Sequence, residues 1–242
     1  MLGYVNVINM LGADQPCFGF QSLGLRDSTR THQTVEEMAS FYIDEMFRFQ
    51  PDPPYVLVGW CYGGILAAEM AVQMSARGRD AALLVLIETP FPRMKKGRAR
   101  YFLSRALNLI GMGPTGWVLY IRNKIEYRKK VEKGAFDKLF SLGLDHGPLA
   151  NRSNVYRTNM GAVSLYRMKD VPSCPVRMFR GEELKEGYIP DVEELWLKMC
   201  PDVRLYSAPG NHLTILKEPG STIVVQKLRE CLKEIPVRQP LG

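Results

Sequence analysis

The chain has 242 residues, of which 46% are hydrophobic and 24% charged, and its formal net charge at pH 7 is +7. This length and composition exclude a collagen-like or low-complexity chain and predict a single α/β domain over residues 1–242. No run of 18 apolar residues and no basic start followed by an apolar core is present, which argues against a membrane span or a signal peptide. We therefore expect a cytoplasmic protein with no membrane partner.

Apolar runs that alternate with helical patterns predict an α/β fold with a mostly parallel sheet flanked by helices. The clearest helix covers Val35–Phe49, where apolar residues recur at helical spacing behind the N-cap residue Thr34. A long insertion, about residues 91–165, interrupts the alternation. In chain order, strands are expected over residues 17–21, 55–59, 82–87, 176–180 and 203–208, and helices over 35–49, 65–73, 191–200 and 222–234.

Five cysteines and three histidines are candidates for redox, metal or nucleophilic chemistry. The cysteines have no CxxC spacing and an odd count, which argues against a disulfide framework. The histidines are far apart and lie in no HExxH or CxxC context, so we expect no metal site and no bound cofactor. The cysteines are then core residues or include a single reactive thiol. The residues concerned are Cys17, Cys61, Cys174, Cys200, Cys231, His32, His146 and His212.

Cys61 stands where a predicted strand turns sharply into a predicted helix, because YVLVG runs into the turn WCYGG. This is the setting of a nucleophile elbow, in which small residues flank the nucleophile since strand and helix approach closely. The positive end of the helix dipole favours a thiolate, and the backbone N–H of Tyr62 can stabilise an oxyanion. The pattern favours Cys61 as a nucleophile over the alternative of a buried structural cysteine.

His212 is the expected base for this thiol. It lies in PGNHLT, directly after the last predicted strand, and elbow-type hydrolases place their histidine last in the chain. His32 and His146 lie in polar or Gly/Pro-flanked loops, and we expect both to be exposed to solvent.

Two places could supply the acid that orients His212. Glu88 ends the apolar run LLVLIE, which should neighbour the nucleophile strand, so its carboxylate would emerge at the catalytic edge of the sheet. Glu182 and Glu183 follow a later strand at another such edge, beside further loop charges. We favour Glu88, because a charged residue that ends an apolar run needs a partner.

Together with the elbow, several segments resemble the thioesterase domains that release products from nonribosomal peptide and polyketide synthases, which have the α/β-hydrolase fold. The resemblance implies a triad of Cys61, His212 and Glu88, an oxyanion donor in the N–H of Tyr62, and a helical lid in the insertion at about residues 91–165. It also implies an acyl-enzyme that is released by hydrolysis or cyclisation. The segments are DQPCFGFQSLGL, TVEEMASFY, PPYVLVGWCYGGILAAEMA, ARGRDAALLVLIETP, NVYRTNMGAVSLY and PGNHLTIL.

Three features depart from the usual pattern of that family. The elbow residue is cysteine where serine is usual, and the acid is glutamate where aspartate is usual. Family members begin with a strand and a Gly-rich loop whose N–H is the second oxyanion donor, and the sequence offers no match for either. Loss of one oxyanion donor costs about 10²- to 10³-fold in turnover. Three alternatives therefore stay open: the sequence begins after this strand and loop, the site uses a different second donor, or the site is impaired.

The partner that the resemblance implies is an acyl or peptidyl carrier protein, or other synthase modules, with the acyl group on a phosphopantetheine arm. From Arg93 to Lys133 the insertion carries twelve Lys and Arg against two Glu, which suits either a solvated face or attraction to an acidic carrier. No nucleic-acid-reading module accompanies this charge, so we expect no nucleic-acid partner, and we expect a monomer.

Two alternatives remain open. A small-molecule hydrolase of the dienelactone-hydrolase type also carries a cysteine at its elbow, but its acid usually follows a later strand. A non-enzymatic alternative is a catalytically impaired relative that binds acyl carriers without turnover.

Overall fold

The computed structural model describes residues 2–27, 29–92, 94, 110, 113–118, 121–122, 125, 149–183 and 191–236. In this part of the chain, parallel strands form one sheet in the order β1-β2-β3-β4. The strands are β1 (Val56–Trp60), β2 (Leu83–Ile87), β3 (Val176–Gly181) and β4 (Val203–Ala208). The helices are α1 (Val5–Leu11), α2 (Val35–Phe49), α3 (Tyr62–Ala76), α7 (Leu149–Leu165), α8 (Asp191–Met199) and α9 (Gly220–Lys233), with 3-10 turns η1 (Leu2–Tyr4) and η2 (Leu23–Leu25).

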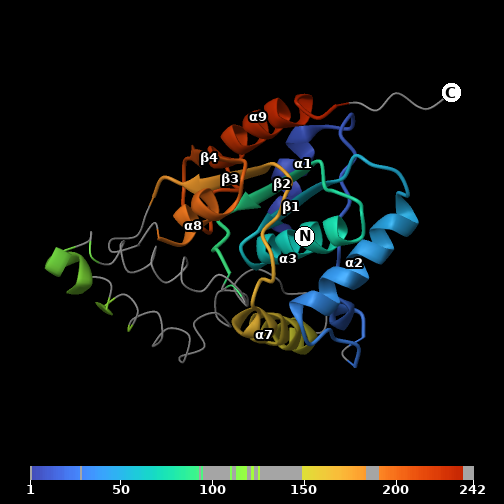
Figure 1. Ribbon diagram of the computed structural model, residues 1–242, viewed down its shortest axis with the longest axis horizontal. Helices are drawn as coiled ribbons and strands as arrows, with labels where there is room; N and C mark the ends of the chain where they lie inside the picture. Colours follow the sequence, from blue (N-terminus) through green and yellow to red (C-terminus); the bar gives the residue numbers. More distant parts are fainter. Residues whose placement is uncertain are drawn as a thin grey trace.

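The sheet lies between two layers of helices (Figure 1). Leu84 and Leu86 of β2 pack in the core that holds α2, α3 and α8. Val85 and Ile87 of the same strand pack in the core that holds α1 and α9. Every residue of β2 is buried, because successive side chains point to opposite, equally covered faces. This explains why β2 reads as a continuous apolar run in the sequence.

The four strands of the sheet and the four helices that we predicted from periodicity are confirmed, with ends that differ from the prediction by at most three residues. Helix α2 has the predicted bounds, and Thr34 caps it by accepting a hydrogen bond from the N–H of Glu37 at 3.1 Å. Helix α3 begins at Tyr62, three residues earlier than the apolar pattern indicates, because the glycines of the elbow already adopt helical geometry.

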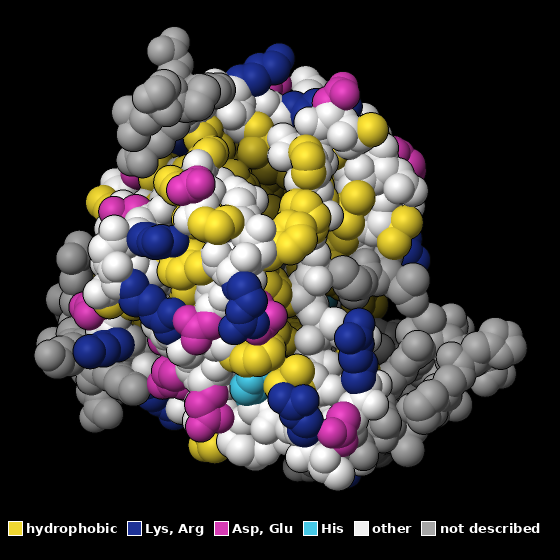
Figure 2. Space-filling model, turned by 90° about the vertical axis from the view of Figure 1, so that its right-hand side faces the viewer, with side chains coloured by type: hydrophobic (Ala, Val, Ile, Leu, Met, Phe, Trp, Pro, Cys, Tyr) yellow, Lys and Arg dark blue, Asp and Glu magenta, His cyan; other side chains and the backbone are white. Residues whose placement is uncertain are grey.

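The predicted strand over residues 17–21 is wrong, since this segment forms no strand. Its aromatic side chains pack on α2 instead: the ring centroids of Phe20 and Tyr42 are 4.7 Å apart, and those of Phe18 and Phe49 are 4.5 Å apart. A band of hydrophobic side chains marks the surface on this side of the molecule (Figure 2). Because residues 17–21 form no strand beside it, β1 is an edge strand of the sheet among the described residues.

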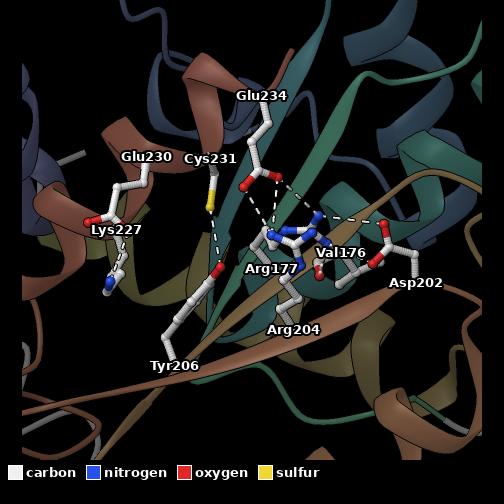
Figure 3. A network of polar contacts seen from close by, with 9 residues as sticks. All are labelled: Val176, Arg177, Asp202, Arg204, Tyr206, Lys227, Glu230, Cys231 and Glu234. Carbon is white, nitrogen blue, oxygen red and sulfur yellow. Dashed lines mark hydrogen bonds and ion pairs between the residues drawn. The ribbon is translucent and has the colours of Figure 1, made fainter.

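A buried arginine links α9 to the amino ends of β3 and β4 (Figure 3). The Arg177 side chain is only 5% exposed, and its guanidinium lies 3.1 Å from Asp202 and 3.7 Å from Glu234. Arg204 of β4 joins the same Glu234 carboxylate at 3.0 Å. These contacts offset part of the desolvation of Arg177, whose buried Nε has no hydrogen-bond partner among the described residues, and they position the C-terminal end of α9. They lie at the edge of the sheet opposite to Cys61, so we regard them as structural.

Helix α7 is the largest described part of the predicted insertion, and it contacts α2, α3 and η2. Most of the basic stretch from Arg93 to Lys133 lies outside the described residues, although Arg122 is described. None of the helices in the described part is long and apolar enough to cross a bilayer. A single domain over residues 1–242 stays a prediction.

Candidate active site

The chain turns sharply at Cys61, between β1 and α3. Cys61 has a backbone φ of 56° and ψ of −124°, a conformation that residues other than glycine rarely adopt. Its N–H donates to the carbonyl of Ile87 at 2.9 Å, which ties the turn to β2. A strained backbone at this point raises the side chain above the end of the strand, as in a nucleophile elbow.

Two glycines allow strand and helix to meet this closely. A Cβ atom on Gly59 would lie 2.3 Å from the carbonyl oxygen of Gly63, and one on Gly64 would lie 2.0 Å from Oγ1 of the buried Thr89. Both distances are shorter than van der Waals contact, so alanine at either position requires the backbone to shift. The small residues that the sequence places around Cys61 are thus a packing requirement.

Tyr62 is the first residue of α3, so its N–H belongs to the group that has no acceptor within the helix. Such N–H groups, together with the helix dipole, attract negative charge. The Tyr62 hydroxyl accepts a hydrogen bond from Nδ2 of the buried Asn159 at 3.2 Å. Asn159 belongs to α7, and it thereby connects the predicted lid to the residue that follows Cys61.

His212 lies in the loop between β4 and α9, and this loop is held by its own hydrogen bonds. The N–H of Asn211 donates to Oγ1 of Thr214 at 2.8 Å, and Oδ1 of Asn211 accepts from the N–H of Leu213 at 3.0 Å. The indole N–H of Trp60 donates to the His212 carbonyl at 3.2 Å. His212 is therefore fixed beside the last residue of β1, next to Cys61.

Glu88 follows β2 and lies beneath His212. Its Oε2 is 3.4 Å from Nδ1 of His212, and its Oε1 accepts the N–H of Gly181 at 2.5 Å. The Glu88 side chain is 11% exposed, whereas the His212 side chain is 44% exposed. Glu88 also has a positive φ of 48°, and its own N–H donates to the carbonyl of Phe179 at 2.9 Å. The carboxylate is thus held from two strands, with one oxygen directed to the imidazole.

The electrostatics of the site favour a protonated imidazole. The pKa of His212 is raised from 6.5 to about 9, first by its hydrogen bond with Cys61 and then by its hydrogen bond with Glu88, while burial opposes the rise. Because this pKa exceeds its unfolded value, the pairing stabilises the fold below about pH 6.5 and loses its effect as the pH rises through about 9.

We predict that His212 titrates near pH 9 and that its midpoint falls in Cys61→Ala and, by a smaller amount, in Glu88→Gln. The Cys61 variant should show the larger fall, because the hydrogen bond with Cys61 raises the His212 pKa more than the hydrogen bond with Glu88 does. NMR titration of the imidazole Cε1–H resonances measures these midpoints, and Glu182→Gln is the control that leaves them unchanged. A wild-type midpoint near 6.5 would contradict the pairing.

The other acidic and histidine candidates lie elsewhere. Glu183 accepts a hydrogen bond from Nδ2 of Asn211 at 3.0 Å, and Glu182 lies exposed beside it. His32 is half-buried rather than solvent-exposed, since its ring packs 5.0 Å from the ring centroid of Phe41. His146 lies outside the described residues. Of these candidates, Glu88 is the acid that contacts His212.

Trp60 and Asn159 contribute to the site although sequence reasoning missed them. Their partners are 152 and 97 residues away along the chain, so no local pattern could have indicated these contacts. Among the described residues, no group of three or more His, Cys, Asp or Glu side chains is arranged to hold a metal ion. The site thus consists of a thiol that contacts an imidazole, which in turn contacts a carboxylate, and all three lie beside a helix N-terminus.

Residues 9–107 match the family model of the Thioesterase domain. The chain is 36% identical to malpibaldin synthetase of Mortierella alpina over 86 residues, which are 36% of this chain and 2% of that protein. It is 25% identical to a dimodular nonribosomal peptide synthase of Bacillus subtilis (strain 168) over 194 residues, which are 80% of this chain and 8% of that protein. The chain thus spans less than a tenth of the length of these curated relatives.

Solved thioesterase structures share the fold. The NocB thioesterase domain, in covalent complex with a fluorophosphonate nocardicin G analog, superposes with a TM-score of 0.65 at 21% identity and covers 96% of this chain and 88% of its own. RedJ, a thioesterase from the prodiginine biosynthetic pathway in Streptomyces coelicolor, gives 0.67 at 20% identity, with 95% and 85% covered. These structures confirm the predicted α/β-hydrolase type of fold, with a parallel sheet flanked by helices.

Proposed function

We propose that the chain is a thioesterase that takes an acyl or peptidyl group from a carrier-protein thioester onto Cys61. The observation that carries this proposal is the strained elbow at Cys61 beside His212, whose Nδ1 lies 3.4 Å from the Glu88 carboxylate. The match to the Thioesterase domain and the relatives among peptide and polyketide synthases support it.

In the proposed acylation step, the proton of the Cys61–His212 pair lies on the imidazole, and the sulfur attacks the thioester carbonyl as a thiolate. The carbonyl electron pair moves onto oxygen, where the N–H of Tyr62 stabilises the negative charge. The tetrahedral intermediate collapses and expels the carrier thiolate, which takes the proton from His212. Glu88 holds the imidazole so that Nδ1–H faces the carboxylate and Nε2 faces the sulfur.

In the second step, His212 takes a proton from water, or from an amine or hydroxyl of the bound chain, and this group attacks the acyl-enzyme. Cys61 leaves as a thiolate and regains the proton. Because attack of a thiol on a thioester exchanges like for like, the acyl-enzyme stays more activated than a serine ester. This favours transfer or cyclisation more than a serine nucleophile would.

The proposed partner is an acidic carrier protein. The basic stretch from Arg93 to Lys133 offers it a complementary charge, which raises the rate of encounter and weakens with salt. No residue of the described site calls for a bound cofactor. The reactive group of the substrate would arrive on the phosphopantetheine arm of the carrier.

The test is intact-protein mass spectrometry after incubation with an acyl thioester, supplied on a carrier protein and as the N-acetylcysteamine thioester. We expect one acyl adduct on the wild type and none on Cys61→Ala. Cys17→Ser is the matched control, because Cys17 is the exposed free cysteine outside the site. No adduct on the wild type, or one that survives Cys61→Ala, would end the proposal. Faster, salt-sensitive acylation from the carrier supports the partner.

The dienelactone-hydrolase alternative is not favoured. In that type of enzyme, the acid that orients the histidine follows a later strand. Here Glu183, which follows β3, accepts a hydrogen bond from Asn211 instead. Glu88 occupies the position beside His212.

A further inference from the structure

Among the described residues, β1 pairs with a strand on one side only, and its other side lies open beside the elbow. The N–H of Cys61 and the carbonyl of Tyr55 both pair with β2, so alternate residues of β1 direct their polar groups to this neighbour. Trp60 is out of phase with them, and its N–H points away from β2 toward the open edge. A donor that lies there would flank Cys61 on the side opposite to Glu88 and β2.

The hydroxyl of Tyr4 lies at this place. The N–H of Trp60 donates to the Tyr4 hydroxyl oxygen at 2.6 Å, and a Cβ atom on Gly63 would lie 3.6 Å from the same oxygen. The hydroxyl thus lies between the last residue of β1 and the first turn of α3, which are the two elements that hold Cys61. Gly3 packs on the Trp60 ring, where a Cβ atom would come within 3.0 Å, so the turn η1 is held tightly.

The Tyr4 hydroxyl still has a hydrogen to donate, because its oxygen is the acceptor in the bond from Trp60. The pKa of Tyr4 is raised to about 12, mainly by burial, with smaller contributions from Tyr62 and Cys61. The phenol therefore stays protonated at neutral pH, and the thiol group of Cys61 lies close enough to affect it. A neutral donor beside a nucleophile is suited to an oxygen that becomes negative during the reaction.

We propose that the Tyr4 hydroxyl is the second oxyanion donor of this site and acts together with the N–H of Tyr62. The assignment rests on the proposed thioesterase function. When Cys61 attacks, the carbonyl oxygen gains the electron pair and accepts hydrogen bonds from both donors, and no proton is transferred to it.

Tyr4→Phe separates this role from a purely structural one. We expect acylation of Cys61 by the N-acetylcysteamine thioester to slow by about 10²- to 10³-fold. Alkylation of Cys61 by iodoacetamide forms no oxyanion, so its rate and its pH dependence should stay at the wild-type values. Peptide mass spectrometry distinguishes Cys61 from the exposed Cys17 in both reactions. Equal losses in acylation and alkylation would mean that Tyr4 only supports the elbow, and would overturn the proposal.

A second variant keeps the ring and the acceptor oxygen. Trifluorotyrosine placed at position 4 loses its proton at a lower pH than tyrosine, so acylation should decline on an alkaline limb that the wild type lacks, while alkylation shows no such limb. If the wild type is acylated and neither variant loses acylation rate, the proposed role of Tyr4 is wrong, while the proposed thioesterase function stands. A wild type that forms no acyl adduct at all overturns the proposed function, and the role of Tyr4 with it.

Discussion

Replacing His212 with glutamine should slow acylation of Cys61 by about 10³- to 10⁴-fold at neutral pH. The hydrogen bond between Cys61 and His212 is the largest cause of the raised imidazole pKa, so the imidazole lies where it can exchange a proton with the thiol. Without the imidazole, only the small thiolate fraction of an ordinary cysteine remains to attack the thioester.

The measurement is the rate of adduct formation on Cys61 as a function of pH. In His212→Gln the rate should rise with pH and recover part of the loss, because the thiol must then lose its proton to the solvent before it attacks. His32→Gln is the matched control, because His32 packs against Phe41 and Tyr42 away from the elbow. A loss of less than about tenfold at neutral pH would show that His212 is not the base.

Replacing Glu88 with glutamine should slow the same reaction by about 10³- to 10⁴-fold. The two carboxylate oxygens have separate partners: Oε1 accepts the N–H of Gly181, and Oε2 faces Nδ1 of His212. Glutamine has one acceptor oxygen, so its NH₂ group must face either the Gly181 N–H or the imidazole N–H. The first arrangement sets the NH₂ group against the N–H donor of Gly181, and the second turns the imidazole or inverts its tautomer. In both, the negative charge beside the imidazole is lost.

Glu182→Gln is the matched control for this change, since Glu182 carries the same group on an exposed loop at the neighbouring strand end. It should acylate within a few-fold of the wild-type rate. Glu183→Gln should have an intermediate effect through Asn211, which belongs to the His212 loop. Loss of acylation in the Glu182 or Glu183 variant, with none in Glu88→Gln, would instead support the dienelactone-hydrolase alternative.

The fold was largely predictable because its strands and helices carry strong periodic signals. Every residue of β2 is apolar and buried, and α2 is marked by its capping residue Thr34. The segment 17–21 also has an apolar, strand-like composition, yet its aromatic side chains pack on α2. Strand propensity reflects a fit to a half-buried surface, and here a helix offers that surface.

The sequence by itself determined the elbow, the positions of the core strands along the chain and the candidates Cys61, Glu88 and His212, because the glycines, the apolar runs and the loop positions are local features. Only the tertiary structure decided that Glu88 rather than Glu183 contacts His212, and that Tyr4 lies against the N–H of Trp60. The physical reason is distance along the chain. A hydrogen bond across 56 residues depends on how η1 and the sheet pack together, and no spacing in the sequence encodes it.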